Sequence, residues 1–395
     1  MKTLIELYDE RPLENVLATE VFRPETTVFL CPTGTAYDKQ IKGKMNSFFS
    51  KRGVNTKIVF KPVDMYNAKS IQKCLCETVK EYPDCALDIT GGTNDALFAA
   101  GMLCAETSVP VFTYSRKKNS FFEINNAGFA EMKCAVSYGV EDCILMAGGA
   151  LKQGRVDNSI LSNYMDIIDP FFEVYRKNRN SWVSAVSFIQ QISGREYSNE
   201  LRVQGQYIQK GERGKKIEAP AAILSGCAKI GMLKDLMIDP DKGVRFEFAD
   251  ENVRAWLRDI GAVLELYVYK ACIDTGVFNN VISSAVVDWE GEPGKTGVTN
   301  EIDVVATSGV IPAFISCKTC DVKTEALNEL SILRDRFGGE MATAALVTTR
   351  YTQAITRRRA MELGIDLIDL NDITKGNLPA RLKRLSVKNI KTNNK

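Results

Sequence analysis

The first 145 residues alternate short apolar runs with segments of helical spacing, and this alternation constrains the fold more than any other feature of the chain. Strands and helices that alternate in this way form a parallel sheet with helices on its faces. The expected strands are Thr3 to Leu7, Thr27 to Cys31, Thr56 to Val63, Ala86 to Ile89 and Val111 to Tyr114, and the expected helices are Tyr37 to Lys51, Ala68 to Tyr82 and Asn94 to Thr107. The sequence therefore predicts an α/β domain over residues 1–145.

The loops that follow these strands contain small polar residues. In an open parallel sheet, a ligand binds outside the carboxyl ends of the strands. The fourth strand is followed by Thr90 to Asn94, reading TGGTN, which offers glycine amides, two hydroxyls and a helix N-terminus to an anion. This loop has neither G-x-G-x-x-G nor Walker spacing, so dinucleotide and nucleoside triphosphate cofactors are not predicted. A tight strand-to-helix turn without a ligand is the alternative.

The order of these loops resembles the CRISPR-associated Rossmann fold (CARF) domain, most specifically over the DITGGTNDALFAAG stretch from Asp88 to Gly101. CARF dimers bind cyclic oligoadenylates made by type III CRISPR complexes. The resemblance implies a Rossmann-like parallel sheet, a homodimer, and cyclic tetra-adenylate as allosteric activator. The residues that it places around this ligand are Asp9, Glu10, Pro32, Thr33, Thr90, Gly91, Gly92, Thr93, Asn94 and Ser115. Asp9 and Glu10 can accept hydrogen bonds from ribose or adenine, or cap a helix instead.

A second motif lies between residues 300 and 318. Ile302 to Val305 and Val310 to Cys317 are apolar runs separated by Thr307 to Gly309, the pattern of a β-hairpin. On this hairpin Asp303 and Lys318 fall at the strand ends, where both side chains can point to one spot in solvent. A carboxylate that holds a divalent metal, beside a lysine that polarises water or phosphate, suits metal-assisted phosphodiester hydrolysis. A surface salt bridge is the alternative.

Together with an upstream helix that carries Glu265, this hairpin resembles the PD-(D/E)xK nuclease core. The resemblance implies a restriction-endonuclease-like α/β domain over residues 250–395 that uses Mn²⁺ or Mg²⁺. Ser316 stands where the second acid is expected, so Glu301, Glu265 or a backbone carbonyl remains open as the further ligand. The implied catalytic residues are Asp303, Lys318, Glu265 and Ser316, and the implied metal ligands are Asp303 and Glu265.

Residues 146–249 are predicted as a helical linker with a winged-helix-like module. Ser162 to Lys177 and Ser181 to Ile192 have helical patterns, and Ser198 to Glu218 has the polar composition of a mobile connection. A helix from Ala221 to Ile230 then precedes a hairpin about residues 239–243. A helix followed by a hairpin fits either a DNA-binding module or a structural spacer. Lys229 is the only basic residue in this helix.

Two further features of the C-terminal domain have open interpretations. Asp288 is either an accessory acid or a turn residue. Arg350 and the run from Arg357 to Arg359 either contact a nucleic-acid backbone or form a solvated helix face.

The chain contains no histidine, and this excludes several classes of hydrolase. Ser-His-Asp and Cys-His catalysis, histidine-ligated zinc and histidine-dependent ribonuclease chemistry all need an imidazole. The HEPN ribonuclease, another common partner of CARF domains, is excluded for the same reason. Any hydrolysis must rest on carboxylates, lysine and metal.

The remaining composition points to a cytoplasmic protein. The 11 cysteines are scattered in apolar contexts, as in a reducing compartment, and no apolar run is long enough to span a membrane. A net charge of +2 implies that nucleic acid is held by local patches rather than by the whole surface.

The pairing of these two domains resembles the CARF-fused nucleases that act as ancillary effectors of type III CRISPR immunity. Such proteins are metal-dependent homodimers that degrade single-stranded RNA and DNA, or nick duplex DNA, when cyclic tetra-adenylate binds. The chain is therefore expected to be a nuclease of this kind. The alternative, favoured by Ser316, is a cyclic-nucleotide-responsive regulator that binds DNA or RNA and carries a degenerate nuclease domain.

Overall fold

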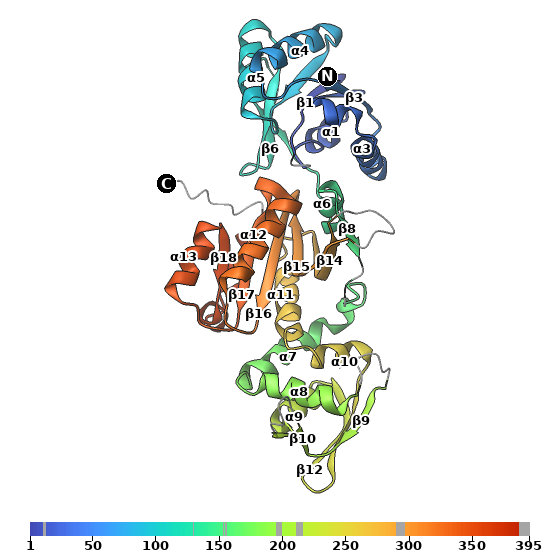
Figure 1. The fold of residues 1–395 in the computed structure, drawn as a ribbon, viewed down its shortest axis with the longest axis vertical. Coiled ribbons are helices and arrows are strands. Elements are labelled where there is room, and N and C mark those ends of the chain that lie inside the picture. The colour runs from blue at the N-terminus through green and yellow to red at the C-terminus, as the bar shows by residue number, and fades with distance from the viewer. Residues whose placement is uncertain are drawn as a thin grey trace.

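The computed structural model describes residues 1–10, 13–128, 130–152, 154, 156–194, 200–210, 216–289 and 297–386, without the side chains of Gln40 and Glu340. Figure 1 shows three parts along the long axis. The N-terminal part (residues 1–139) lies at one end, the central part (residues 140–152 and 262–386) lies in the middle, and the distal part (residues 156–257) lies at the other end. Within the described ranges no helix is long and apolar enough to cross a membrane.

The N-terminal part is a mostly parallel sheet in the order β3-β2-β1-β4-β5-β6-β7, in which β6 and β7 are antiparallel. Its strands are β1 (Thr3–Leu7), β2 (Thr26–Cys31), β3 (Lys57–Pro62), β4 (Cys85–Asp88), β5 (Val111–Ser115), β6 (Ser120–Glu123) and β7 (Met132–Lys133). Its helices are α1 (Leu17–Phe22), α2 (Thr33–Tyr37), α3 (Lys39–Lys51), α4 (Ala68–Glu81) and α5 (Asn94–Glu106). The predicted α/β fold class is confirmed.

Two details of this part differ from the sequence prediction. The helix expected from Tyr37 to Lys51 is split, because Asp38 is extended and its carboxylate accepts a hydrogen bond from the N–H of Ile41 at the start of α3. In addition, α1 and the antiparallel strands β6 and β7 were not predicted. They are too short to show a helical or strand periodicity of apolar residues.

The central part is a sheet in the order β18-β17-β16-β15-β14-β8. Its strands are β8 (Ala150–Lys152), β14 (Asn280–Asp288), β15 (Thr299–Ser308), β16 (Ile311–Lys318), β17 (Thr343–Thr348) and β18 (Ile365–Ile368). Its helices are α6 (Val140–Met146), α11 (Ala262–Asp274), α12 (Thr324–Gly338), the 3-10 turn η3 (Gly339–Met341), α13 (Ala354–Glu362), α14 (Leu370–Thr374) and α15 (Leu378–Lys383). Strand β8 comes from the stretch predicted as linker, and it pairs with the edge of β14.

Helices cover both faces of this sheet, which explains why its strands read as continuous apolar runs. Val304 and Ile315 belong to the core that contains α11, whereas Val305 and Phe314 belong to the core that contains Leu330 of α12. Successive residues of one strand thus point to opposite faces.

The distal part combines helices with an antiparallel sheet in the order β12-β13-β9 and the hairpin β10-β11. Its elements are the 3-10 turn η1 (Leu161–Tyr164), α7 (Met165–Lys177), α8 (Trp182–Ile192), β9 (Arg202–Gly205), β10 (Ile208–Lys210), β11 (Lys216–Glu218), α9 (Ala221–Lys229), β12 (Leu233–Asp239), β13 (Gly243–Phe248) and α10 (Glu251–Leu257). The prediction of a mobile connection from Ser198 to Glu218 is wrong where β9, β10 and β11 form. Residues 198, 199 and 211–215 of that stretch lie outside the described residues.

The distal part shares one apolar core with α11 of the central part. The rings of Phe172 on α7 and Tyr267 on α11 stack at a centroid separation of 3.8 Å. The hydroxyl groups of Tyr175 and Thr349 are 2.6 Å apart, within hydrogen-bond distance. This part therefore supports the helix that carries Glu265.

The turn of the β15-β16 hairpin is joined to the N-terminal part by three residues, Tyr138, Asn279 and Gly309, which we call the Gly309 clamp. The Tyr138 N–H donates to the Gly309 carbonyl at 2.9 Å, and the Gly309 N–H donates to Asn279 Oδ1 at 2.8 Å. Asn279 Nδ2 in turn donates to the Tyr138 carbonyl at 2.9 Å. The positive φ of Gly309, 60°, allows the two-residue turn that makes these contacts possible.

Tyr138 is fully buried and packs against α3 of the N-terminal part. Its ring lies edge-on to Phe48 with a centroid separation of 5.7 Å, and the Arg52 guanidinium lies 5.3 Å from its centre. Arg52 also pairs with Glu20 at 2.7 Å and with Asp142 of α6 at 3.4 Å. The clamp therefore ties the hairpin turn to a helix of the N-terminal sheet.

The core of the N-terminal sheet also contains two carboxyl groups, Glu6 and Asp88, side by side on β1 and β4. Both are almost completely buried. Burial raises the pKa of Asp88 to about 7, although the Thr90 hydroxyl and N–H donate to it. Burial, followed by the charge of Asp88, raises the pKa of Glu6 well above its ordinary value. At a pH between the ordinary carboxyl pKa and these raised values, Glu6 and Asp88 therefore stay protonated in the folded sheet, whereas they are ionised in the unfolded chain.

Because of these raised pKa values, the N-terminal sheet should lose stability as the pH rises from about 4 to about 7, the window in which only the unfolded chain has released the protons. Asp88→Asn keeps an acceptor for Thr90 and removes one ionisable group, so we expect a flatter dependence. The measurement is urea unfolding at several pH values with hydrogen exchange of β1 and β4 as the readout. Glu77→Gln on the exposed side of α4 is the control. An unchanged pH dependence in Asp88→Asn would contradict the assignment.

Candidate functional site

The TGGTN loop lies at the carboxyl edge of the N-terminal sheet and packs against the loop after β1. Asp9 Oδ2 accepts a hydrogen bond from the Gly92 N–H at 2.9 Å, and Asp9 is buried. A Cβ on Gly91 would lie 2.9 Å from the Cβ of Asp9, and one on Gly92, which has φ 105°, would lie 2.8 Å from that of Leu7. Glycine is required at both positions because this loop closely approaches Leu7, at the end of β1, and Asp9, just after it.

Both hydroxyls of this loop already have partners within the protein. Thr93 caps α5 by accepting from the Ala96 N–H at 3.2 Å, and it donates to the Met65 carbonyl at 2.7 Å. Thr90 donates to Asp88 and accepts from the Tyr114 N–H at 2.9 Å. These contacts order the loop, while the role that we expect for it in ligand binding stays a prediction.

The other predicted ligand residues lie around the same edge. Glu10 follows β1, Pro32 precedes α2, Thr33 begins α2, and Asn94 begins α5, all of them exposed. Ser115 ends β5 and its hydroxyl accepts from the Lys118 N–H at 3.3 Å. The structure thus gathers the predicted set at the carboxyl ends of neighbouring strands β1, β2, β4 and β5.

The second candidate site is built on the β15-β16 hairpin. Lys318 Nζ lies 3.6 Å from Asp303 Oδ2, and the same oxygen accepts from the Cys317 N–H at 2.5 Å and from the Ser316 hydroxyl at 3.1 Å. Burial is the largest influence on Lys318 and opposes its charge, yet the nearby Asp303 carboxylate raises the pKa of this lysine. Ser316 therefore orients Asp303 from the position where an acid was expected.

Glu265, one turn into α11, faces the hairpin from the covering helix. It lines a cavity of about 210 Å³ together with Val156, Ala255, Trp256, Asp259, Ala262, Ser284, Glu301 and Asp303. Burial raises the pKa of Glu265 to about 8, with further contributions from the charges of Asp303, Asp259 and Glu301 that Lys318 opposes. Acids from α11, from the loop before it and from β15 thus face one space.

Asp259 and Ser284 were not predicted as site residues. Asp259 Oδ1 accepts from the N–H groups of Gly261 and Ala262 at 2.7 and 3.2 Å, so it caps α11. An aspartate just before a helical pattern is a recognised cap signal that could have been found. Ser284 lies on β14 with φ 51°, an unusual conformation for a residue other than glycine. No sequence signal marks that conformation.

The donor set suits a hard divalent cation that retains several waters, as Mg²⁺ and Mn²⁺ do. Carboxylates supply the oxygen ligands, and burial, followed by the charges of neighbouring acids, raises the pKa of Glu265. Over the described ranges no group of three or more acidic or cysteine side chains is close enough to hold a metal ion. Asp303 and Glu265 would accordingly contribute two ligands, with water completing the shell.

Other predicted features have structural roles. Asp288 ends β14, buried, with its Oδ2 2.6 Å from Lys152 Nζ of β8, so its prediction as a turn residue is wrong. In the arginine run, Arg357 pairs with Asp369, and both Arg358 and Arg359 approach Glu362, at 3.2 and 3.6 Å. Much of the positive charge of this run is therefore balanced locally.

A comparison with family models finds one match, over residues 250–387, to the family described as "Card1-like, endonuclease domain". This segment contains α11 and the β15-β16 hairpin. The likeness to Card1-like endonucleases therefore concerns residues 250–387. The search of curated proteins returned no match.

Solved structures resemble the chain over nearly its whole length. Protein VC1899 from Vibrio cholerae has a TM-score of 0.76 and 18% identity, with 97% of this chain and 98% of that chain covered. Can2 from Sulfobacillus thermosulfidooxidans, solved in complex with cyclic tetra-adenylate, has a TM-score of 0.70, 17% identity and the same coverage. The resemblance to CARF-domain nucleases is confirmed for the overall fold and for the endonuclease domain.

A substitution of Gly261, just before α11, tests where the Glu265 carboxylate lies. A Cβ at this position would lie 2.7 Å from Glu265 Oε1, so Gly261→Ala should displace the carboxylate from the cavity. We expect about tenfold weaker Mn²⁺ binding by calorimetry, as for a change that disturbs the orientation of a ligand. Gly101→Ala, where a Cβ meets nothing within 4 Å, should bind as the wild type does. Unaltered Mn²⁺ affinity in Gly261→Ala would argue against Glu265 as a ligand.

Proposed function

We propose that this protein is a metal-dependent nuclease of type III CRISPR defence that cyclic tetra-adenylate activates. One observation carries the proposal: Asp303 and Glu265 face one cavity, with Lys318 beside Asp303, within a Card1-like endonuclease domain. The likeness of the whole fold to Can2, which was solved with cyclic tetra-adenylate, supports the choice of activator. The expected substrates are single-stranded RNA and DNA, and duplex DNA that is nicked.

The residues of the site have distinct roles in this proposal. Asp303 is held in position by the Cys317 N–H and the Ser316 hydroxyl, so its carboxylate is preorganised. Lys318 orients the attacking water and offers a positive charge to the scissile phosphate. Bound Mn²⁺ or Mg²⁺ would supply Lewis-acid polarisation of the phosphate and a lowered pKa for water.

The acids around the cavity support the proposal of a cation there. Glu265 is buried among Asp303, Asp259 and Glu301, and these carboxylates repel one another. Lys318 alone offsets only part of this repulsion. A divalent cation would favour the ionised form of Glu265, and the neighbouring cap of α11 by Asp259 keeps that helix end in place.

The sensor is the N-terminal sheet, and the hairpin is the connection from it to the site. The β15-β16 turn is held by the Gly309 clamp at the sensor end, and the same strands carry Asp303 and Lys318 nearer the other end. In a homodimer, a ligand that binds one arrangement of the sensors better shifts the population toward it. The hairpin would transmit this shift as a rigid element.

The regulator without catalysis remains the second candidate, because Ser316 stands at the position of an acid. In that case the sensor would still bind cyclic nucleotide, and the central part would bind nucleic acid without cleaving it. The two candidates differ in one property, which is cleavage in the presence of metal.

The deciding experiment measures cleavage of labelled single-stranded RNA, single-stranded DNA and supercoiled plasmid with Mn²⁺, with and without cyclic tetra-adenylate. We expect cleavage that needs both, and a loss of at least about a hundredfold in Asp303→Asn and in Lys318→Ala, because each removes a charged group from the site. Nucleotide binding should be unaffected in both variants. Full activity in either variant would refute the site assignment, and tight nucleotide binding without any cleavage by the wild type would favour the regulator.

The Gly309 clamp generates a separate prediction about activation. Asn279→Ala removes two side-chain hydrogen bonds from the clamp, to Tyr138 and to Gly309. We expect stimulation by cyclic tetra-adenylate to fall about tenfold, a typical size for an allosteric coupling, with nucleotide affinity and Mn²⁺ affinity retained. Asn163→Ala on the exposed η1 turn is the matched control. Undiminished stimulation in Asn279→Ala would exclude the clamp as the connection.

A further inference from the structure

Two arginines, Arg179 and Arg350, meet at the carboxyl end of β17, although they come from different parts of the chain. Arg350 closely follows β17, and Arg179 lies in the distal part, between α7 and α8. Arg179 Nη1 donates to the Thr349 carbonyl at 3.2 Å. Burial raises the pKa of the Tyr175 hydroxyl, and the charges of both arginines oppose this rise. The two guanidinium groups therefore lie near the same point.

The stretch after β17 is joined to the strand end that carries Lys318. Thr348 is the register partner of Lys318, so the two backbones are about 5 Å apart. The Thr349 N–H donates to the Lys318 carbonyl at 3.2 Å, and Arg350 Nε donates to the Thr319 carbonyl at 3.2 Å. Because β16 lies between them, β17 and the strand with the catalytic carboxylate, β15, are about 10 Å apart. A single strand with one phosphate about every 3.4 Å covers this span in about three nucleotides.

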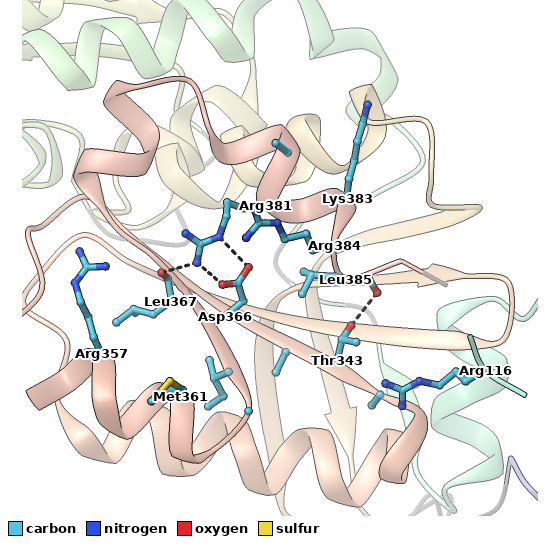
Figure 2. Close-up of a pocket in the computed structure, with 15 residues that line it drawn as sticks. Arg116, Thr343, Arg357, Met361, Asp366, Leu367, Arg381, Lys383, Arg384 and Leu385 are labelled. Carbon is cyan, nitrogen blue, oxygen red and sulfur yellow. Dashed lines mark hydrogen bonds and ion pairs between the residues drawn. The ribbon is translucent and has the colours of Figure 1, made fainter. Parts of the chain in front are cut away.

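Other arginines near β17 and β18 are balanced by acids. Figure 2 shows Arg381 paired with Asp366, and the same guanidinium donates to the Leu367 carbonyl at 3.1 Å. Arg357, on α13, pairs with Asp369. The charges of these arginines are therefore used within the fold.

Arg179 and Arg350 have no such balance, since over the described ranges no acid lies within ion-pair distance of either. Their hydrogen bonds in this part of the chain go to backbone carbonyls, those of Thr349 and Thr319. A neutral carbonyl leaves the positive charge of a guanidinium in place. Both side chains are partly exposed, and each guanidinium has five N–H donors, so several remain for a ligand.

The next residue, Tyr351, presents an aromatic ring at the same strand end. It is 72% exposed, yet its backbone is held on both sides. The Arg350 carbonyl accepts from the Leu370 N–H at 3.1 Å, and Thr352 donates to Asp369 Oδ2 from its N–H and its hydroxyl, at 3.2 and 3.1 Å. An uncovered ring on a fixed stretch of backbone suits stacking against a nucleobase.

We propose that the carboxyl end of β17 is a substrate subsite, in which Arg179 and Arg350 bind phosphates of a single-stranded nucleic acid and Tyr351 stacks against one of its bases. The inference rests on the proposed nuclease function and adds the residues that hold the strand beside the reacting bond. Arginine suits this role because its guanidinium pairs with phosphate oxygens in a planar fork. Because Arg179 belongs to the distal part, that part completes the subsite.

The test measures binding of labelled single-stranded DNA and RNA of about 12 nucleotides, several times the estimated span. It uses the full-length protein with saturating cyclic tetra-adenylate, in EDTA so that the strand is not cleaved. We expect Arg179→Gln and Arg350→Gln each to weaken binding about tenfold. Each should also lower the slope of log affinity against log salt by about 0.7, the value for one phosphate contact on a single strand. Glutamine can still donate to the backbone carbonyl, so the loss reports the charge.

Three further variants separate this role from a structural one. Arg176→Gln is the matched control, because Arg176 of α7 pairs with Glu173 at 2.8 Å, and it should bind as the wild type does. Arg179→Lys keeps the charge and should recover most of the salt slope, which a purely structural tie to Thr349 would not explain. With Mn²⁺ present, Arg350→Gln should raise KM more than it lowers kcat.

The stacking role of Tyr351 is tested in the same assay. Tyr351→Ala should weaken binding about tenfold, within the range for one stacked base. Tyr351→Phe keeps the ring and should bind as the wild type does. Neither variant should change the salt slope, because neither removes a charge.

The outcomes that overturn the subsite differ from those that overturn the nuclease. Wild-type affinity and salt slope in Arg179→Gln and Arg350→Gln, with cleavage intact, would overturn the subsite and leave the nuclease standing. Equal losses in Tyr351→Ala and Tyr351→Phe would overturn the stacking role. No binding and no cleavage by the wild type would overturn both proposals. Displacement of the strand by an equal charge of poly-glutamate would indicate a site for acidic peptides and overturn the subsite.

Discussion

The structure depends on the three hydrogen bonds of the Gly309 clamp, because they fix the turn of the hairpin that carries Asp303 in the middle of β15 and Lys318 at the end of β16. The turn at Gly309 belongs to the central sheet, yet its carbonyl accepts from the N–H of Tyr138, which is buried against α3 of the N-terminal part. Val310 and Ile311 lie in the same apolar core as residues of the N-terminal part. A shift of the N-terminal part would therefore be transmitted to the hairpin, which is paired on both edges.

The candidate site holds a buried carboxyl group among other acids. Burial and neighbouring acids hold the pKa of Glu265 at about 8, while Asp303 is surrounded by donors from Ser316, Cys317 and Lys318. Two carboxylates that face one cavity thus differ in environment: one is hydrogen-bonded and partly compensated, and the other is desolvated. Ser316, at the position where a second acid is expected, belongs to the first of these environments, because its hydroxyl donates a hydrogen bond to Asp303.

Much of the fold could be predicted because the apolar residues of its helices and strands recur with a clear helical or strand spacing. Strands β1 to β5 of the N-terminal sheet and the hairpin around Asp303 are bounded by glycine or polar turns, and each was predicted close to its observed range. The meeting of Glu265 with Asp303 followed from a family resemblance rather than from periodicity. Glu301 was foreseen as an open ligand, but Asp259 was missed, although it lies just before α11 and accepts hydrogen bonds from the first N–H groups of that helix.

What could not be predicted is contact between segments distant in sequence. The edge strand β8 joins β14 from a position more than a hundred residues earlier, and three short strands form within a polar stretch that lacks apolar alternation. The hydrogen bond between Tyr138 and Gly309 is of the same kind. Turn chemistry suggests Gly309 as a bend, but no local signal names its partner.

The distal part bears on how the endonuclease domain should be regarded. The family match begins at residue 250, but α11 packs against α7 through the stacked rings of Phe172 and Tyr267, and Tyr175 contacts Thr349 beyond β17. Removal of the distal part would expose the apolar outer face of the helix that carries Glu265. Its burial orients that helix and so sets the depth of the carboxylate in the cavity. The distal part is therefore a structural support of the helix that carries Glu265.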